Sequence, residues 1–435
     1  MEPVGGGQAG GAVNRRLSKV SLQSLLDTYE KGKSIDENGL VTFQGMFLMD
    51  APETLESLID FNPQVPPLER GSILRQALKA AGASGVLTEK SLCEELIRFE
   101  GAFLALPRHE FEFVSRISVD LEAACEFQAT GGRIRLSREI APAIADARLR
   151  VFSDNHESLR DPDKWGWLAM RVVARTYTEA AELGFRQVRA LIGGWNHLLL
   201  LRRRQLFSRG SRTSPDIRLG PLQTIHNADG SAAANDYWFD QSWQGAGAGW
   251  APKFIGRYQT WDGAINGIQI LLSKVEELDQ KFGIAEILGS YQAALEDVDS
   301  NSGTLKMWGV LEAITNSANL DHTKTVARAI AIFGDRESGR LFLDPVRQLR
   351  NSFAHRGQES HLAGAMLERA RIVVDAHLEL LFADGGRFAN HDEYGQMLSL
   401  PPDPETLRRQ VELRRVALEL LHAPPPEPRP PDRES

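Results

Sequence analysis

Cysteine is scarce in this sequence: Cys93 and Cys125 are the only two among 435 residues. They form no CxxC pair, and no histidine stands near either of them at the spacing of metal ligands, which argues against a disulfide framework and a structural zinc site. The sequence also lacks an apolar run of the roughly 20 residues needed to cross a bilayer, and its N-terminus lacks the apolar core of a signal peptide. We therefore expect a cytoplasmic protein with two buried thiols and no membrane partner.

An excess of positive charge is missing as well, since the formal net charge is −8. This argues against a protein that coats nucleic acid indiscriminately, but it leaves room for a local basic patch. Glycine loops that cradle phosphate and dinucleotide fingerprints after a strand do not occur either, so nucleotide hydrolysis is not expected. What is present, 42 % hydrophobic and 25 % charged residues, is typical of a soluble globular protein with two or three domains.

Composition and turn formers divide the chain into regions. Glycine-rich residues 1–14 and proline-rich residues 423–435 are predicted to be disordered tails. Residues 15–250 are predicted to be an α+β region with a sensing or regulatory role, because short β-rich segments alternate there with helical patterns such as "SILRQALKAAGA". The β-rich segments are "GLVTFQGMFLM", "FEGAFLAL", "FEFVSRISVDL" and "GGRIRLS". Residues 165–204 have a helical pattern, and "LQTIHNADGSAAANDYWFDQSW" predicts two strands joined by a loop with an Asp-Gly turn.

The second half of the chain has a helical pattern from residue 261 to about residue 382. Short breaks rich in Gly, Ser, Asn and Asp separate the predicted helices, which span 262–281, 284–298, 305–318, 323–333, 344–356 and 360–383. Together they predict an all-helical bundle over 255–384. A linker and a C-terminal amphipathic helix at 404–422 are expected within residues 385–422.

The stretch "LRNSFAHRGQ", residues 349–358, places an arginine, an asparagine and a histidine at the end of one predicted helix. Asp344 and Pro345 supply an N-cap acceptor and a first-turn proline. Gly357 suits the left-handed residue that ends a helix. We therefore expect one helix from residue 344 to residue 356, with the three polar residues in its last two turns.

At about 100° per residue, Asn351 and His355 share a face of this helix, whereas Arg350 and His355 are about 140° apart. The latter two converge only if the helix end unwinds or the arginine side chain reaches round. The negative end of the helix dipole favours the protonated form of His355, which suits general acid–base catalysis.

The run Arg350-Asn351-Ser352-Phe353-Ala354-His355 resembles the signature of HEPN domains. With "LKMWGVLEAITN" before it and "HRGQ" after it, the chain is most similar to the HEPN branch that is often fused to a separate N-terminal domain in bacterial anti-phage defence proteins. The resemblance covers roughly residues 255–384 and does not extend to the N-terminal half. It implies a HEPN-like helical bundle that acts as a homodimer and cuts RNA without a metal or cofactor.

In such a homodimer, the two motifs face one cleft. Carried over to this sequence, His355 would exchange protons with the attacking ribose 2′-hydroxyl or the leaving 5′-oxygen, Arg350 would hold the scissile phosphate, and Asn351 would orient one of these groups. The products would end in a 2′,3′-cyclic phosphate or a 3′-phosphate, and RNA is required because DNA lacks the 2′-hydroxyl. We expect a regulated, toxin-like effector of abortive infection, with a phage-derived or cellular trigger acting at the N-terminal region.

The bare spacing of arginine and histidine is not specific. It also occurs at Arg150/His156, Arg356/His361, Arg371/His377 and Arg415/His422. In a structural alternative, Arg350 pairs with a surface carboxylate and His355 caps carbonyl groups at the helix end. In a functional alternative, the domain is a non-catalytic HEPN-like dimerisation or RNA-binding module in a defence or regulatory complex.

Other basic side chains are candidates for RNA binding, with a solvated surface as the alternative. They are Arg356, His361, Arg202, Arg203 and Arg204. The last three begin an arginine-rich stretch, residues 202–218, in which Phe207 could stack on a base. No metal site is predicted, because the carboxylates of Asp229, Asp236 and Asp240 match no calcium-loop spacing.

Overall fold

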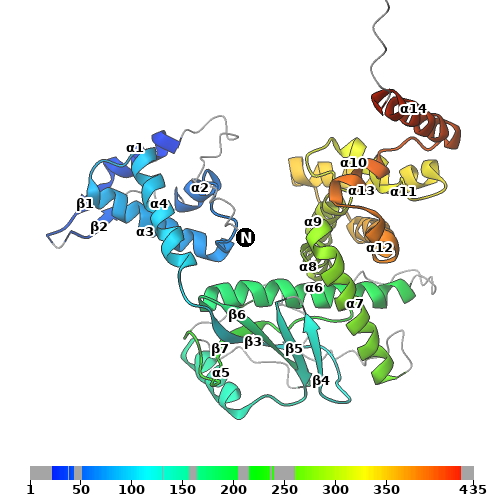
Figure 1. Ribbon diagram of the computed structural model, residues 1–435. Coiled ribbons are helices and arrows are strands. Elements are labelled where there is room, and N and C mark those ends of the chain that lie inside the picture. The colour runs from blue at the N-terminus through cyan, green and yellow to red at the C-terminus, as the bar shows by residue number, and fades with distance from the viewer. Residues whose placement is uncertain are drawn as a thin grey trace, which may run out of the picture. The chain divides into compact units, whose positions relative to one another are not determined.

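The computed structural model describes residues 22–37, 39–43, 51–129, 131–155, 164–203, 215–235, 238–239 and 260–422 (Figure 1). Contacts between residues divide the chain into two compact units. The first unit consists of Met1–Ile192 and Asp216–Ser273, and the second consists of Gly193–Pro215 and Lys274–Ser435. The division falls inside two long helices, α6 (Tyr177–Arg203) and α7 (Trp261–Phe282), so each of these helices supplies residues to both units.

The first unit begins with helices and a small antiparallel hairpin. These elements are α1 (Leu22–Lys31), β1 (Lys33–Ile35), β2 (Val41–Phe43), α2 (Ala51–Ser57), α3 (Pro67–Ser84) and α4 (Glu89–Leu104). The four helices and β2 contribute to one hydrophobic core, which includes Leu26 and Leu74. The prediction of a β-rich segment at "FEGAFLAL" is wrong, because α4 starts at a capping box on Thr88 and continues through that segment with Leu96 and Phe103 buried at helical spacing.

A six-stranded antiparallel sheet follows, in the order β4-β5-β6-β3-β7-β8. Its strands are β3 (His109–Ile117), β4 (Cys125–Ala129), β5 (Gly132–Ser137), β6 (Gly166–Ala174), β7 (Leu222–Asn227) and β8 (Trp238–Phe239). On one face, the rings of Phe113 in β3 and Phe185 in α6 meet edge to face at 5.0 Å. On the other face, Ile144 of α5 (Pro142–Asn155) forms an apolar cluster with Val114 and Ala169. The N-terminal part of the chain is therefore an α+β region, as predicted.

Three further elements of this region differ from the prediction. Residues 166–174 were expected to be helical but form β6, in which exposed Arg171 and Val173 alternate with buried neighbours at the period of a strand. Strand β4 and helix α5 were not predicted. The hairpin expected over residues 222–243 is confirmed in its described part, where β7 and β8 pair antiparallel with Leu222 opposite Phe239.

The described part of the second unit is helical. It contains α8 (Ile284–Glu296), α9 (Ser300–Ile314), α10 (His322–Ala329), α11 (Arg336–Arg356), α12 (Ala363–Asp384), α13 (His391–Leu398) and α14 (Pro404–His422), together with the ends of α6 and α7. Helix α9 packs against α8 and α12 and buries Trp308 and Leu311 completely. The predicted helical C-terminal part is confirmed, although α13 was not predicted. Among the described helices, none combines the length and the apolar character that a membrane span requires.

Candidate active site

Helix α11, which carries the Arg350 motif, begins two turns earlier than predicted. Its N-cap is Asp335, whose carboxylate accepts a hydrogen bond from the backbone N–H of Ser338 at 3.0 Å. Pro345 therefore lies inside the helix, and the expected start at Asp344 is wrong. The missing N–H of Pro345 would have bonded the carbonyl of Leu341, a residue that is 62 % exposed, so water can satisfy that carbonyl instead.

The end of α11 is as predicted. Gly357 has φ 63° and ψ 19°, and its N–H donates to the carbonyl of Phe353 at 2.9 Å. The segment that follows is attached to α9, because the N–H of Ser360 donates to Oδ1 of Asn301 at 2.9 Å. The hydroxyl of Thr304, one turn along α9, donates to the carbonyl of Ala363 at 3.1 Å. Residues 357–362 are thus held at both ends, next to the motif.

Arg350 is half-buried and has little role in holding the fold together. Its Nη1 donates to Oδ1 of Asn351 at 3.4 Å, and its Nε is buried without a hydrogen-bond partner. Two other arginines of α11 are neutralised, since Arg340 pairs with Glu337 and Arg347 pairs with a carboxylate one turn away. Within the described residues Arg350 forms no ion pair, so the structural alternative for this side chain is not realised.

His355 is exposed, as are Arg356 and His361. None of these three side chains makes a hydrogen bond or an ion pair with another described residue, so His355 does not cap the carbonyl groups of its own helix. Because α11 stays helical through Arg356, Arg350 and His355 remain about 140° apart around its axis. One chain therefore places Asn351 and His355 on a shared face but does not bring Arg350 into contact with His355.

The competing match at Arg371/His377 is part of the interior. Arg371 is 2 % exposed and pairs with Asp375 and Glu368. The Nδ1 of His377 lies 2.6 Å from the hydroxyl of Tyr394, and its Nε2 lies 2.9 Å from the carbonyl of Ala329. Desolvation lowers the pKa of His377 to about 4, even though the backbone hydrogen bond acts in the opposite direction. This imidazole is therefore neutral at physiological pH and structural.

A buried polar network was not anticipated from the sequence. The carboxylate of Asp375 lies 2.8 Å from Nδ1 of His197, accepts a hydrogen bond from the hydroxyl of Tyr291 at 2.9 Å and pairs with Arg371. Burial, followed by the negative charge of Asp375, raises the pKa of Tyr291 well above its usual value. Only the four-residue spacing of Arg371 and Asp375 along α12 was available as a sequence signal.

Most of the other candidate residues have side chains that lie outside the described part of the structure. Arg202 and Arg203 end α6, but their side chains are not described, and Arg204, Phe207, Asp236 and Asp240 lie outside the described residues. Asp229 closes a turn, where its Oδ1 accepts hydrogen bonds from the N–H and the hydroxyl of Ser231. The described residues contain no group of three or more His, Cys, Asp or Glu that could hold a metal ion.

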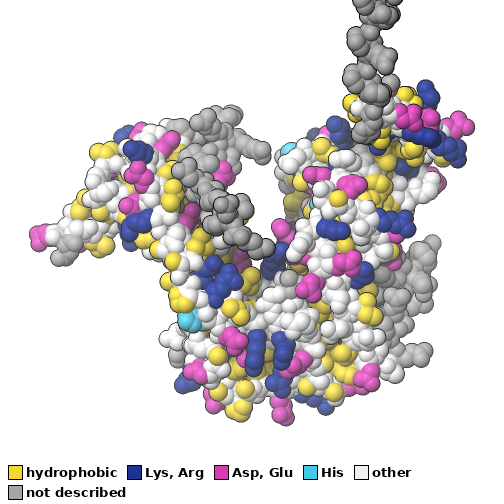
Figure 2. Space-filling view, viewed as in Figure 1, with side chains coloured by type: hydrophobic (Ala, Val, Ile, Leu, Met, Phe, Trp, Pro, Cys, Tyr) yellow, Lys and Arg dark blue, Asp and Glu magenta, His cyan; other side chains and the backbone are white. Residues whose placement is uncertain are grey.

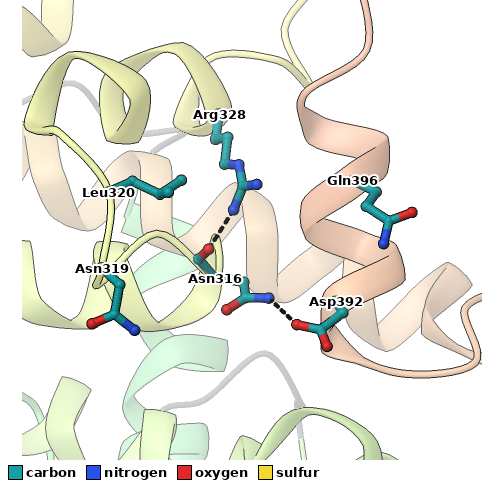
Figure 3. Close-up of a pocket in the computed structure, with 6 residues that line it drawn as sticks. All are labelled: Asn316, Asn319, Leu320, Arg328, Asp392 and Gln396. Atoms are coloured by element: carbon teal, nitrogen blue, oxygen red, sulfur yellow. Dashed lines mark hydrogen bonds between the residues drawn. The ribbon is translucent and has the colours of Figure 1, made fainter.

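A polar pocket of about 360 Å³ lies at the other end of α9, between α10 and α13 (Figure 3). Its lining consists of Asn316, Asn319, Leu320, Arg328, Asp392 and Gln396. Nε of Arg328 donates to Oγ of Ser399 at 2.9 Å, and Nη1 donates to the backbone carbonyl of Thr315 at 3.2 Å. Nδ2 of Asn316 donates to Oδ1 of Asp392 at 2.8 Å. The charged groups of this pocket therefore join three helix ends, and we assign it no catalytic role.

Comparison of the chain with protein-family models, with curated proteins and with solved structures finds no match. The chemistry of the Arg350 motif therefore rests on its own geometry.

Proposed function

We propose that the second unit is a HEPN-type endoribonuclease that cleaves RNA without a metal ion and acts as a homodimer. The observation that carries this proposal is that Arg350 and His355 are not engaged in ion pairs with other described residues. Both lie at one end of α11, and the fold uses neither of them for an ion pair within the described residues. A half-buried arginine that forms no ion pair within the described residues, and an exposed histidine five residues further along the helix, are suited to a phosphate and a proton, respectively.

The proposed reaction needs only groups of this chain. One imidazole of His355 accepts the proton of the ribose 2′-hydroxyl as its oxygen forms a bond to phosphorus, and the bond from phosphorus to the 5′-oxygen breaks. A protonated imidazole returns a proton to that 5′-oxygen, which leaves a 2′,3′-cyclic phosphate. The guanidinium of Arg350 offers donors to the phosphate oxygens as negative charge builds on them, and Oδ1 of Asn351 fixes its orientation.

The separation of Arg350 from His355 in one chain supports the dimer. Because α11 holds the two side chains about 140° apart, a second copy of the motif is the simplest source of the complementary group across a cleft. The same separation also fits the alternative function, a HEPN-like dimerisation or RNA-binding module that does not cleave. In either case we propose a role in anti-phage defence, with the first unit receiving a phage-derived or cellular trigger.

The test is cleavage of single-stranded RNA by the full-length protein in the presence of EDTA, with detection of 2′,3′-cyclic phosphate ends. Arg350→Ala and His355→Ala should abolish cleavage. Arg340→Ala is the matched control, since this arginine lies on the same helix but is exposed and paired with Glu337. Arg371→Ala is unsuitable because it would break a buried ion pair.

Expression in cells extends the test to a triggered enzyme. Total RNA and growth are compared for wild type and the same variants, with and without phage infection. If RNA stays intact in every condition while a stable dimer is present, the nuclease is excluded and the non-catalytic module is favoured. Salt-dependent RNA binding without a cyclic-phosphate product would identify an RNA-binding module.

A further inference from the structure

The polar pocket at the end of α9 contains an arginine and an aspartate that do not pair with each other (Figure 3). Asn316 lies between them, because its backbone carbonyl accepts a hydrogen bond from Nη1 of Arg328 and its Nδ2 donates to Oδ1 of Asp392 at 2.8 Å. Within the described residues, neither Arg328 nor Asp392 forms an ion pair. The pocket therefore presents one positive and one negative side chain that no opposite charge of the fold neutralises.

Arg328 is held in one orientation and still has donors to spare. Its Nε donates to Oγ of Ser399 at 2.9 Å, and its Nη1 donates to the backbone carbonyls of Thr315 and Asn316. These three acceptors fix the planar guanidinium, whereas the two N–H groups of Nη2 have no partner among the described residues. A fixed guanidinium with free donors is pre-organised for an acceptor group of a ligand.

The acceptor side of the pocket is also unused by the fold. Oδ1 of Asp392 accepts the hydrogen bond from Asn316, but no described residue donates to Oδ2. Each carboxylate oxygen can accept more than one hydrogen bond, so both oxygens stay available to a ligand. The side-chain amides of Asn319 and Gln396 line the same pocket and make no hydrogen bond with a described residue. Each amide offers a ligand both donors and an acceptor.

The balance of charge restricts the class of ligand. Arg328 and Asp392 leave the lining without a net charge, and acidic and basic side chains are interspersed on the face of the second unit that Figure 2 shows. A free anion therefore gains no electrostatic advantage in this pocket. A zwitterionic amino acid would occupy the two charged groups but leave the amides without partners. A neutral planar base, with donors and acceptors along its edges, uses both kinds of group.

We propose that this pocket binds a guanine base. Arginine, asparagine, glutamine and aspartate are side chains that read the edges of bases, and proteins recognise single-stranded RNA through bases that are splayed out of the stack. Guanine has two adjacent acceptors, O6 and N7, on one edge and two adjacent donors, N1–H and the N2 amino group, on the next. The acceptors match Nη2 of Arg328, and the donors match the carboxylate of Asp392. None of the three other bases has two adjacent donor groups.

The size and the wall of the pocket agree with a single base. Its volume of about 360 Å³ is near the lower end of the range for ligand pockets, about 300–1,000 Å³. Leu320 supplies an apolar side chain for the flat face of the base. This inference goes beyond the proposed nuclease, because a base can be bound whether or not RNA is cut. Single-stranded RNA and a free guanine nucleotide present the same base edges, so the experiment must distinguish these two sources.

The test is the affinity of the full-length protein for two pairs of probes. One pair is GMP and AMP, measured by calorimetry. The other is a pair of fluorescein-labelled oligouridine strands with a single central guanosine or adenosine, measured by anisotropy in a His355→Ala background so that cleavage does not interfere. In at least one pair, the guanine probe should bind roughly tenfold or more tightly than the adenine probe.

Asp392→Asn tests the assignment of the base. The variant keeps the shape of the side chain and an oxygen for the hydrogen bond from Asn316, but it replaces the second acceptor by a donor. The preference for guanine should fall roughly tenfold or more, since an asparagine amide matches the donor and acceptor of adenine instead. Glu405→Gln is the matched control, because Glu405 is an exposed carboxylate in the first turn of α14 as Asp392 is in the first turn of α13. It should change no affinity.

The outcomes separate this inference from the nuclease. The guanine pocket is rejected if no probe binds, if guanine and adenine probes bind equally, or if Asp392→Asn weakens all probes alike or none. RNA cleavage that persists in that case leaves the proposed function intact. A guanine preference that depends on Asp392 supports the pocket even if wild type never cleaves RNA. A preference confined to the oligonucleotides identifies guanosine within RNA as the ligand, and a preference for GMP over AMP identifies a free guanine nucleotide.

Discussion

The imidazole of His197 lies 2.8 Å from the carboxylate of Asp375, and both side chains are almost completely buried. Arg371 and Tyr291 bond to the same carboxylate. Because His197 belongs to α6, Tyr291 to α8 and the other two to α12, one carboxylate connects three helices. A buried charge is tolerated only when its partners are present, so this network makes the packing of these helices sensitive to the loss of a single group.

Asp375→Ala should lower the free energy of unfolding by about 3–5 kcal/mol, because it removes the fully buried partner of Arg371 and the acceptor of the Tyr291 hydroxyl. Urea unfolding followed by circular dichroism measures the change. Glu419→Ala serves as the control, since it removes an exposed ion pair with Arg415 and should have no measurable effect. A wild-type-like urea midpoint for Asp375→Ala would show that the network does not hold the helices together.

Stability should fall on acidification through His377. Its pKa is about 4 in the folded protein, against about 6.5 in an unfolded chain, so between these values the unfolded chain binds a proton that the folded protein does not. The stabilising contribution is therefore complete above about pH 6.5 and is lost as the pH falls toward 4. This difference in pKa corresponds to a loss of roughly 3 kcal/mol in the free energy of unfolding at the acidic end.

The measurement is the free energy of unfolding of wild type and His377→Gln from pH 7 to pH 4.5. Subtracting the variant removes the contributions of other groups, including His226, whose pKa burial also lowers to about 4. The free energy of unfolding of wild type minus that of the variant should decrease as the pH falls. A difference that is independent of pH would mean that His377 titrates normally in the folded state.

Arg350→Lys separates charge from geometry at the proposed active site. Lysine keeps the positive charge but lacks the planar fork that can bond two phosphate oxygens, so we expect cleavage of RNA to fall by roughly tenfold or more. The melting temperature should stay unchanged, because Arg350 contributes one long hydrogen bond, to Asn351, and no ion pair within the described residues. Arg340→Lys is the control. Full activity of Arg350→Lys would contradict the role of the fork.

Helices and strands could be predicted from the sequence where neighbouring residues carry the signal for them. The end of α11 was predictable, because Gly357 is a local signal for a left-handed residue. Its start was not, since Asp344-Pro345 looks like a helix start and only the packing of Leu343 and Val346 on the bundle shows that the helix continues through it. The sequence predicts a helix over residues 166–174, because nothing local shows that β3 and β5 flank this segment in a sheet.

The candidate site, too, could be predicted only as far as local spacing shows it. Arg350, Asn351 and His355 could be singled out by spacing, but the same spacing at Arg371/His377 describes two interior side chains. Burial, which separates the two pairs, depends on contacts between distant helices such as α6 and α12.

Gly357→Ala tests whether the end of α11 sets the geometry of the motif. At φ 63° an alanine is strained by about 1 kcal/mol, although no atom lies within 4 Å of the added Cβ, so the expected loss of stability comes from the backbone alone. Gly364→Ala in α12 is the control, because its Cβ would meet only Oγ of Ser300 at 3.7 Å and alanine favours helix. We expect Gly357→Ala to reduce RNA cleavage and Gly357→Asn to restore part of it, since asparagine tolerates the left-handed conformation. If Gly357→Ala melts at the wild-type temperature and cleaves normally, residues 357–362 do not position the motif.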